Sequence, residues 1–262
     1  MVCEQKTSEK VNQALKDIED VTLLALDDRS GCANLLSLAG NVSDLELTPP
    51  AEIGDPKETC SCILWSSGTT GRPKGILHSH QSSWNWITYS SFPLPIHYFM
   101  TLHFFHVNGV YHIMTCLLSG SRVTFVSNSG FRVLFSKTKW SHFQAQGENF
   151  TLEKALSCIR DTRPGVLLLG THHYVQLSEY DISRSKISSQ ELKSVKSIVP
   201  LGAAVPSSCR EGLTKMFPLT AFITEGYGQT ECGVIVTGFQ DNPGLGQIVP
   251  WAVVKVCWLL EK

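Results

Sequence analysis

A stretch rich in glycine and hydroxyl side chains, residues 66–75, constrains the fold of this chain more than any other feature. Its sequence is Ser-Ser-Gly-Thr-Thr-Gly-Arg-Pro-Lys-Gly, and it follows an apolar run at residues 61–65 that is typical of a strand. Glycine tolerates positive φ angles, so backbone N–H groups in such a stretch can converge on an anion. The hydroxyls add donors, and Lys74 adds a positive charge suited to phosphate. The stretch therefore predicts a polyphosphate-binding loop, with a polar turn between a strand and a helix as the alternative.

This stretch differs from the Walker loop of many nucleotide-binding proteins. Counted from Gly68, the Gly-Lys pair that the Walker motif requires falls on Pro73 and Lys74. We therefore expect another kind of phosphate loop, built from the residues with a permissive backbone, a hydroxyl or an ammonium group. These residues are Ser66, Ser67, Gly68, Thr69, Thr70, Gly71, Lys74 and Gly75.

A second stretch whose residues could bind a ligand, Gly-Tyr-Gly-Gln-Thr-Glu, occupies residues 226–231 and follows an expected strand at 221–224. It fails the dinucleotide-binding fingerprint, because Glu231 stands where the last glycine is required. Tyr227, between two glycines, could lay its ring on a base. A carboxylate such as Glu231 could hold a magnesium ion that bridges phosphates. An ordinary turn explains the same residues equally well.

The periodicity of apolar residues predicts alternating strands and helices joined by short connections, which favours an α/β fold over an all-α or all-β one. The expected helices lie around Val11, Ala14, Leu15 and Ile18, at residues 151–160, and at residues 207–217 with Ser207 or Ser208 as the cap. Further strands are expected at residues 21–26, 122–126, 166–169 and 234–237.

The composition excludes several classes of protein. The 262 residues are 42% hydrophobic and 17% charged, which is too apolar for a disordered chain. A net charge of −1 argues against broad electrostatic binding to nucleic acid or anionic membranes. No apolar run reaches the ~18 residues of a membrane span, and nothing at the N-terminus resembles a signal peptide. The nine cysteines are scattered, so we expect reduced thiols in an intracellular, cytoplasmic or peroxisomal protein.

Together, the two stretches resemble the signatures of the adenylate-forming superfamily, which includes acyl-CoA synthetases, 4-coumarate–CoA ligases and beetle luciferases. Residues 66–75 match its phosphate loop almost letter for letter, and residues 226–231 match its second signature. Phe-His-Val-Asn-Gly at 105–109 and Pro-Gly-Leu-Gly-Gln-Ile-Val-Pro at 243–250 resemble further family segments. Residues 201–206 resemble another, although Leu201 and Ala204 replace its first glycine and its proline.

The resemblance implies layered mixed sheets flanked by helices, forming part of the family's large N-terminal domain without its small C-terminal domain. Residues 1–262 would be a partial adenylation domain. The implied reaction is ATP-dependent activation of a carboxylic acid, fatty or aryl, to an acyl-adenylate, followed by transfer to coenzyme A. The implied cofactors are ATP and Mg²⁺, with coenzyme A as co-substrate, and the implied partner is a small-molecule acid.

Residue roles follow from the same resemblance. Thr230 would contact the α-phosphate, Glu231 would hold Mg²⁺, Lys74 would contact phosphate and His106 would lie near the carboxylate. The adenine and acyl pockets would be lined by Gly202, Ala203, Ala204, Gly226, Tyr227 and Gly228.

No residue of this chain matches the family's catalytic lysine or its ribose-binding aspartate. We therefore expect these 262 residues to be a fragment or short isoform with impaired activity. A non-catalytic nucleotide- or acyl-binding protein derived from the family is the main alternative. A degenerate chain that folds poorly is the third possibility.

Two pairs of histidines allow a metal site as one interpretation, but no third ligand at suitable spacing accompanies either pair. We expect His78 and His80 on the helix that leaves the phosphate loop. His172 and His173 stand where the family has a proline-containing turn beside the acyl pocket. An aromatic cluster is expected in the core rather than around a ligand, and it consists of Tyr98, Phe99, Phe104, Phe105 and Tyr111.

Residues 127–147 show neither the apolar period of a helix nor that of a strand. They include Arg132, Lys137 and Lys139, have no acidic side chain and show no clear period. We expect an inserted surface loop here, with a basic docking site as the alternative. An unstructured loop this long is uncommon in a compact domain.

Overall fold

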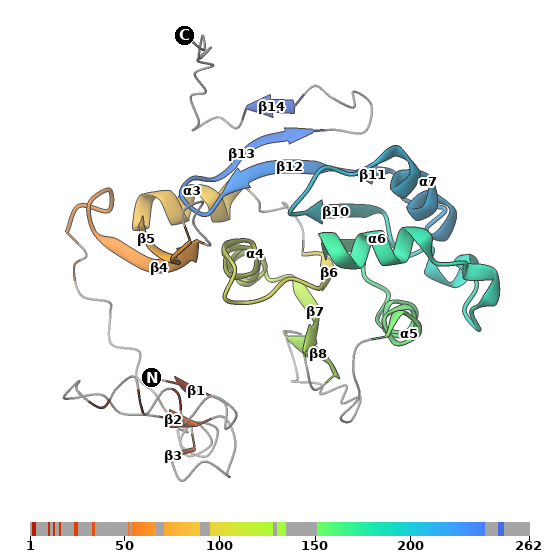
Figure 1. The fold of residues 1–262 in the computed structure, drawn as a ribbon, viewed down its shortest axis with the longest axis horizontal. Coiled ribbons are helices and arrows are strands. Elements are labelled where there is room, and N and C mark those ends of the chain that lie inside the picture. The colour runs from red at the N-terminus through yellow and green to blue at the C-terminus, as the bar shows by residue number, and fades with distance from the viewer. Residues whose placement is uncertain are drawn as a thin grey trace. The chain divides into compact units, whose positions relative to one another are not determined.

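The computed structural model describes residues 54–66, 71–89, 95–127, 130–134, 151–238 and 246–248, with residues 2–3, 10, 13, 16, 24–25, 33–34 and 52 before them. The chain divides into two compact units, residues 1–53 and 54–262 (Figure 1). The first unit contains three parallel strands, β1 (Val2–Cys3), β2 (Leu24–Ala25) and β3 (Ala33–Asn34). Strand β2 lies within the strand expected at residues 21–26, while the first expected helix lies outside the described residues.

A six-stranded sheet organises the second unit, in the order β11-β10-β9-β6-β7-β8. All neighbours are parallel except the last pair. The strands are β6 (His97–Met100), β7 (Arg122–Ser127), β8 (Gly130–Leu134), β9 (Val166–Gly170), β10 (Ser197–Leu201) and β11 (Phe222–Ile223). The strands expected at residues 122–126 and 166–169 are confirmed, as is the α/β class.

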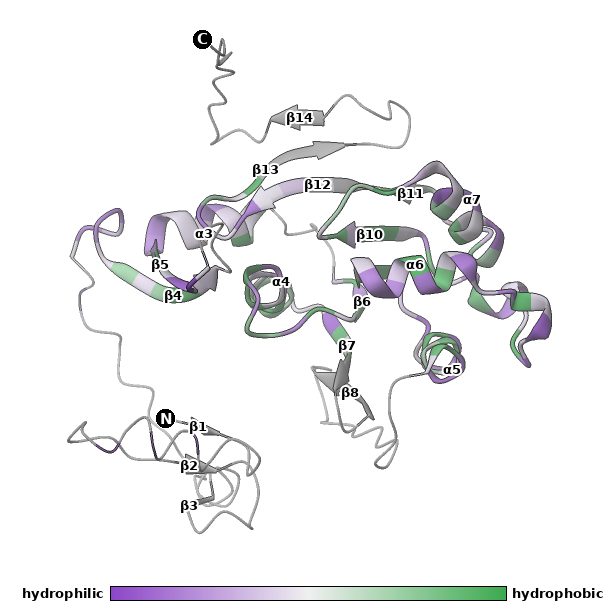
Figure 2. Cartoon of the chain, in the orientation of Figure 1, coloured by the Kyte–Doolittle hydropathy of each residue, from purple (hydrophilic) through white to green (hydrophobic). Residues whose placement is uncertain are grey.

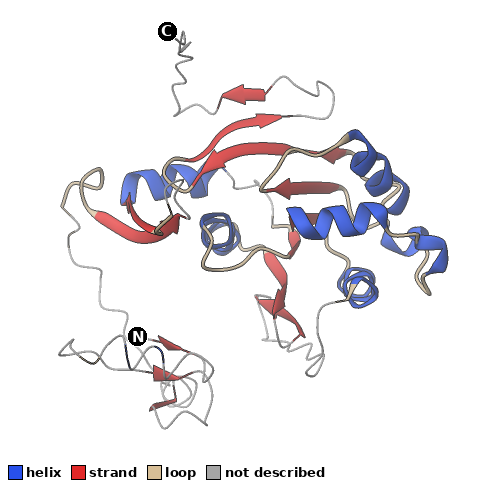
Figure 3. Cartoon of the chain, in the orientation of Figure 1, coloured by secondary structure: helices blue, strands red, loops and turns tan. Residues whose placement is uncertain are grey.

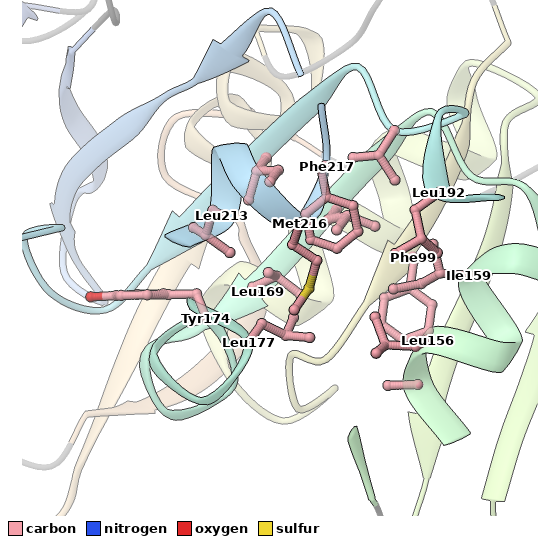
Figure 4. Close-up of a cluster of buried hydrophobic side chains, with 14 of the residues drawn as sticks. Phe99, Leu156, Ile159, Leu169, Tyr174, Leu177, Leu192, Leu213, Met216 and Phe217 are labelled. Carbon is pink, nitrogen blue, oxygen red and sulfur yellow. The ribbon is translucent and has the colours of Figure 1, made fainter. Parts of the chain in front are cut away.

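Helices cover both faces of this sheet (Figure 3). They are α4 (Val107–Leu118), α5 (Leu152–Thr162), α6 (Thr171–Glu179) and α7 (Ser207–Met216), with short 3₁₀ turns η1 (Ile182–Arg184) and η2 (Ser189–Leu192). Because successive strand residues point to opposite faces, Leu167 and Leu169 both pack with α5, α6 and α7. Figure 4 shows Leu169 in this cluster. Val166 and Leu168 pack on the other face, where α4 contributes Cys116.

The starts of α5 and α7 differ in chemistry. Thr151 caps α5, with its Oγ1 accepting a hydrogen bond from the Lys154 N–H, and Arg163 ends the helix at a φ of 52°. The expected serine cap of α7 is wrong, because Pro206 occupies the cap position and Ser207 is the first helical residue. The fixed φ of proline brings the extended chain into the helix without a side-chain hydrogen bond.

Two smaller antiparallel sheets carry the two signature stretches. One is the hairpin β4 (Cys60–Ser66) and β5 (Lys74–Ser79), followed by α3 (His80–Tyr89). The other contains β12 (Glu225–Gln229), β13 (Gly233–Gly238) and β14 (Gly246–Ile248). Leu64, Trp86, Val107 and Tyr111 form the cluster that packs β4, α3 and α4 together.

The structure corrects three expectations. Residues 66–75 connect two antiparallel strands rather than a strand and a helix, so His78 lies in β5, and only His80 begins a helix. Strand β8 occupies part of the stretch expected to be a loop, because its residues extend the sheet beside β7. Residues 135–147 lie outside the described part of the chain.

The aromatic residues expected in the core divide into two groups. Tyr98, Phe99 and Tyr111 are buried as expected. Phe104 and Phe105 are exposed, Phe105 to 76%, because they lie in the tight turn between β6 and α4 rather than on either element.

The helices of the second unit combine polar and apolar faces (Figure 2). Among the described residues, no helix is both long enough and apolar enough to cross a membrane. The cysteines of this part of the chain are all free. Cys116, Cys158 and Cys209 are buried, whereas Cys60 and Cys232 are exposed.

Candidate functional site

The hairpin that bears the first signature has two polar side chains, Ser66 and Lys74, at the end where its connecting loop begins and ends. Ser66 is only 8% exposed, and its Oγ has no hydrogen-bond partner. Opposite it in the ladder stands Lys74, which is exposed and whose ammonium group makes no hydrogen bond or ion pair with the described residues. Gly71 has a φ of 103° and open space around the position of a Cβ. Residues 67–70, which include Ser67, Gly68, Thr69 and Thr70, lie outside the described part of the chain.

The second signature is itself a strand, rather than a turn after one. Gly226, Tyr227 and Gly228 lie in β12, and Thr230 and Glu231 lie in the turn that leads to β13. Gly228 is required by close packing, because a Cβ there would lie 2.2 Å from the carbonyl oxygen of Gly233. The Tyr227 side chain is 59% exposed and available to a ligand.

His78 brings the two signatures together. It lies four residues after Lys74 in β5, and its side chain is buried. Burial lowers the pKa of His78, while the backbone carbonyl of Thr230 and the carboxylate of Glu231 act to raise it. The imidazole therefore lies beside the turn that carries the two residues expected at the α-phosphate and the metal.

The carboxyl ends of β6, β9 and β10 form a second part of the site, at the edge of a parallel sheet where ligands commonly bind. Hydrogen bonds connect these ends. Gly170 N–H donates to Thr101 Oγ1 at 3.0 Å, and Thr171 Oγ1 donates to the Leu201 carbonyl at 3.1 Å. Tyr174 Oη donates to the Ala204 carbonyl at 3.1 Å.

These bonds shape the segment after β10. Gly202 has a φ of 109°, and a Cβ at this position would lie 2.6 Å from Thr171 Oγ1. Gly202, Ala203 and Ala204 are exposed at the end of the strand. Sequence reasoning missed Tyr174, because its hydrogen bond depends on tertiary contacts that no motif records.

His106 lies at the start of α4, between the strand edge and solvent. Its Nδ1 accepts a hydrogen bond of 3.2 Å from the Asn108 N–H, so the side chain caps the helix. Burial and then the neighbouring His103 lower the pKa of His106. Burial, His172 and His103 likewise lower the pKa of His173.

The sequence did not single out His103. This residue lies in the turn before α4, and its charge helps to lower the pKa of His173 at the start of α6. His172 and His173 lie in the first turn of α6. Across the described residues, no group of three or more His, Cys, Asp or Glu side chains is arranged to hold a metal ion.

Comparisons with known proteins show the family and the fold of this chain. The family model described as AMP-binding enzyme matches residues 1–257. A mitochondrial malonate–CoA ligase from Xenopus laevis is 26% identical over 76% of this chain and 32% of its own length. A 4-coumarate–CoA ligase from Pinus taeda is 24% identical over 93% of this chain and 44% of its own.

The fold has counterparts among solved structures. The luciferase-like enzyme of the nonluminescent mealworm Zophobas morio superposes with a TM-score of 0.69 at 19% identity, covering 90% of this chain and 50% of that one. The fold is therefore the α/β fold of the adenylate-forming enzymes. The chain belongs to the AMP-binding enzyme family, and it spans less than half the length of the two curated relatives described above.

Proposed function

We propose that this chain binds Mg-ATP and a carboxylic acid and forms an acyl-adenylate, which is then transferred to coenzyme A. The observation that carries the proposal is the convergence of the two signatures. His78, on the strand that follows the phosphate hairpin, is buried beside the turn that contains Thr230 and Glu231. The hairpin that bears the first signature and the Glu231 carboxylate thus meet at His78, which supports a metal–nucleotide complex between the two signatures.

The donor groups suit such a complex. Ser66 Oγ is a buried hydroxyl without a partner, and the Lys74 ammonium is unpaired among the described residues. Glu231 is an exposed carboxylate that makes no hydrogen bond or ion pair with the described part of the chain. Magnesium typically takes one or two protein carboxylates together with phosphate oxygens. When bound, it would neutralise charge that develops on the phosphates.

Each of the remaining residues has a role in this proposal. Lys74 and the loop hydroxyls bind the outer phosphates, Thr230 contacts the α-phosphate and the exposed ring of Tyr227 stacks on adenine. The acid lies at the strand edge formed by Gly202, Ala203 and Ala204, with its carboxylate near His106. The acid is proposed to be fatty or aryl. Two relatives are named for malonate and for 4-coumarate, and both acids belong in the test.

The test is isotope exchange between pyrophosphate and ATP by the 262-residue chain, with dodecanoate, benzoate, 4-coumarate and malonate offered separately. We expect exchange that depends on an added acid and is lost in Glu231→Gln. Its rate should be low, because removing one preorganised electrostatic contact costs ~10²–10³ in rate and no residue here matches the family's lysine. Nucleotide binding with no exchange for any acid would favour a binding protein. No binding of nucleotide would refute the proposal.

A further inference from the structure

His78 is a buried titratable group to which the proposed function assigns no role. Its side chain is 6% exposed, and its Nε2 has no hydrogen-bond partner. A buried polar nitrogen without a partner is costly, so its position needs an explanation other than packing. The ring stands edge-on to Tyr111, with centroids 5.6 Å apart and planes at 69°.

The surroundings of His78 fix its position on one side. Tyr111 Oη is hydrogen-bonded to Ser83 Oγ at 3.0 Å, and Ser83 Oγ is bonded to Ser61 Oγ at 2.6 Å. These bonds connect α4, α3 and the start of β4. The imidazole therefore packs edge-on against a tyrosine whose hydroxyl group is held by hydrogen bonds.

On its other side, His78 faces the turn of the second signature. The Thr230 carbonyl and the Glu231 carboxylate both act to raise the pKa of the imidazole, against the larger lowering by burial. The far end of the same turn rests on α3, because a Cβ on Gly233 would lie 2.3 Å from Trp86 Nε1. The Cys232 N–H donates to the Gln229 carbonyl at 3.3 Å and closes the turn. The turn is thus anchored on Trp86, which packs against the same Tyr111 ring that His78 contacts.

We propose that His78 is a positioning residue for Glu231: its imidazole supports the turn at Thr230 and holds the carboxylate next to the phosphate hairpin. The effect on the bound metal rests on the proposed function, whereas the effect on the turn does not. Glu231 reaches a nucleotide only through the metal, whereas Thr230 in the same turn is proposed to contact the α-phosphate directly. Loss of His78 therefore weakens Mg-ATP binding more than it weakens metal-free ATP binding. A residue needed only for packing would not separate the two affinities.

The first test needs no ligand. Amide hydrogen exchange is measured on peptides that cover residues 225–238 in the wild-type chain, in His78→Leu and in His80→Leu. His80 is the matched control, because it lies two residues away at the start of α3. Faster exchange at residues 230–233 in His78→Leu alone supports the proposal. Unchanged exchange in that variant overturns it.

The second test measures the affinities for ATP with Mg²⁺ and with EDTA by calorimetry. We expect His78→Leu to weaken Mg-ATP binding about three- to tenfold, as expected for a single lost polar contact, and to weaken binding in EDTA less. In a Glu231→Gln background the same substitution should have a smaller effect, because part of its influence passes through that carboxylate. Equal weakening with and without Mg²⁺ would contradict the proposal.

Conservative variants identify the group responsible. Asn places an amide near the position of Nδ1, and Gln places one near that of Nε2. Recovery of Mg-ATP affinity in His78→Asn or His78→Gln supports a polar contact with the turn. If both variants fold and both bind as weakly as His78→Leu, the positioning role is wrong. If the wild-type chain binds no ATP but His78→Leu still loosens the turn, the proposed function fails and the structural role stands.

Discussion

Gly233 and Trp86 lie so close that a Cβ on residue 233 would come within 2.2 Å of the indole Cδ1. Gly233 also has a φ of 69°, a backbone conformation that residues other than glycine rarely adopt. Trp86 is 4% exposed and packs against Tyr111, with ring centroids 4.7 Å apart, so it cannot move aside. The turn that carries Glu231 is therefore attached to α3 at a position that accepts only glycine.

This contact predicts a large cost for Gly233→Ala. Overpacking and the positive φ together should lower the free energy of unfolding by about 2–4 kcal/mol, measured by urea denaturation. Gly120→Ala is the control, because Gly120 has a φ of 64° and no atom lies within 4 Å of the point that a Cβ would occupy. Gly120→Ala should lower the free energy of unfolding only by the cost of placing alanine at a positive φ, about 1–2 kcal/mol. Equal costs for the two variants would show that Trp86 does not restrict the turn.

A second prediction concerns stability at acid pH. Burial, reinforced by Arg122, lowers the pKa of His97 from 6.5 to about 4, and burial lowers that of His112 to about 4. Between pH 6.5 and about pH 4, these two histidines bind protons in the unfolded chain but not in the folded chain. The free energy of unfolding should therefore fall as the pH drops from 6.5 towards 4, by on the order of 2–3 kcal/mol for each histidine.

Urea denaturation at several pH values provides the measurement. His112→Gln keeps a donor for the Asn108 carbonyl, which His112 Nδ1 reaches at 2.7 Å, but it does not titrate. The variant should show a shallower pH dependence than the wild-type chain across this window. An identical slope in the two proteins would mean that His112 is not buried as a neutral group.

The reactivity of the cysteines offers a third prediction. Burial raises the pKa of both Cys116 and Cys158 to about 12, so neither supplies thiolate at neutral pH. Cys60 and Cys232 are exposed. Among the cysteines whose burial the structure describes, iodoacetamide under native conditions should therefore alkylate Cys60 and Cys232 before Cys116 and Cys158, as located by peptide mass spectrometry. Early modification of Cys158 would contradict the packing of α5 on the sheet.

The sequence contained enough information for the core of the sheet and for the helices α5 and α7. The apolar run at residues 166–169 is uninterrupted, as expected for a parallel strand buried on both faces, and β9 is such a strand. The helix expected at residues 151–160 is α5, whose inward residues Ala155, Leu156 and Ile159 are almost fully buried. In both elements the local period and the tertiary environment require the same residues.

Other parts could not be predicted, because tertiary contacts decide them. Strand β5 has alternating exposure, but its first residues belong to a glycine-rich signature that suggested a turn before a helix. The roles of His103 and Tyr174 depend on neighbours from other strand ends. Of the candidate site, the chemistry of the two signatures was visible in the sequence, whereas their convergence through His78 required the fold.

Isothermal titration of the 262-residue chain with Mg-ATP tests most directly the claim that the two signatures form one nucleotide site. Lys74→Ala and Thr70→Ala remove contacts of the first signature, and Glu231→Gln removes the carboxylate of the second. Loss of a charge-assisted contact is worth roughly 1.5–3 kcal/mol, so each variant should bind about tenfold or more weakly. Lys57→Ala, at an exposed lysine before β4, should bind as the wild-type chain does. Unchanged affinity in Lys74→Ala, Thr70→Ala and Glu231→Gln would contradict the account.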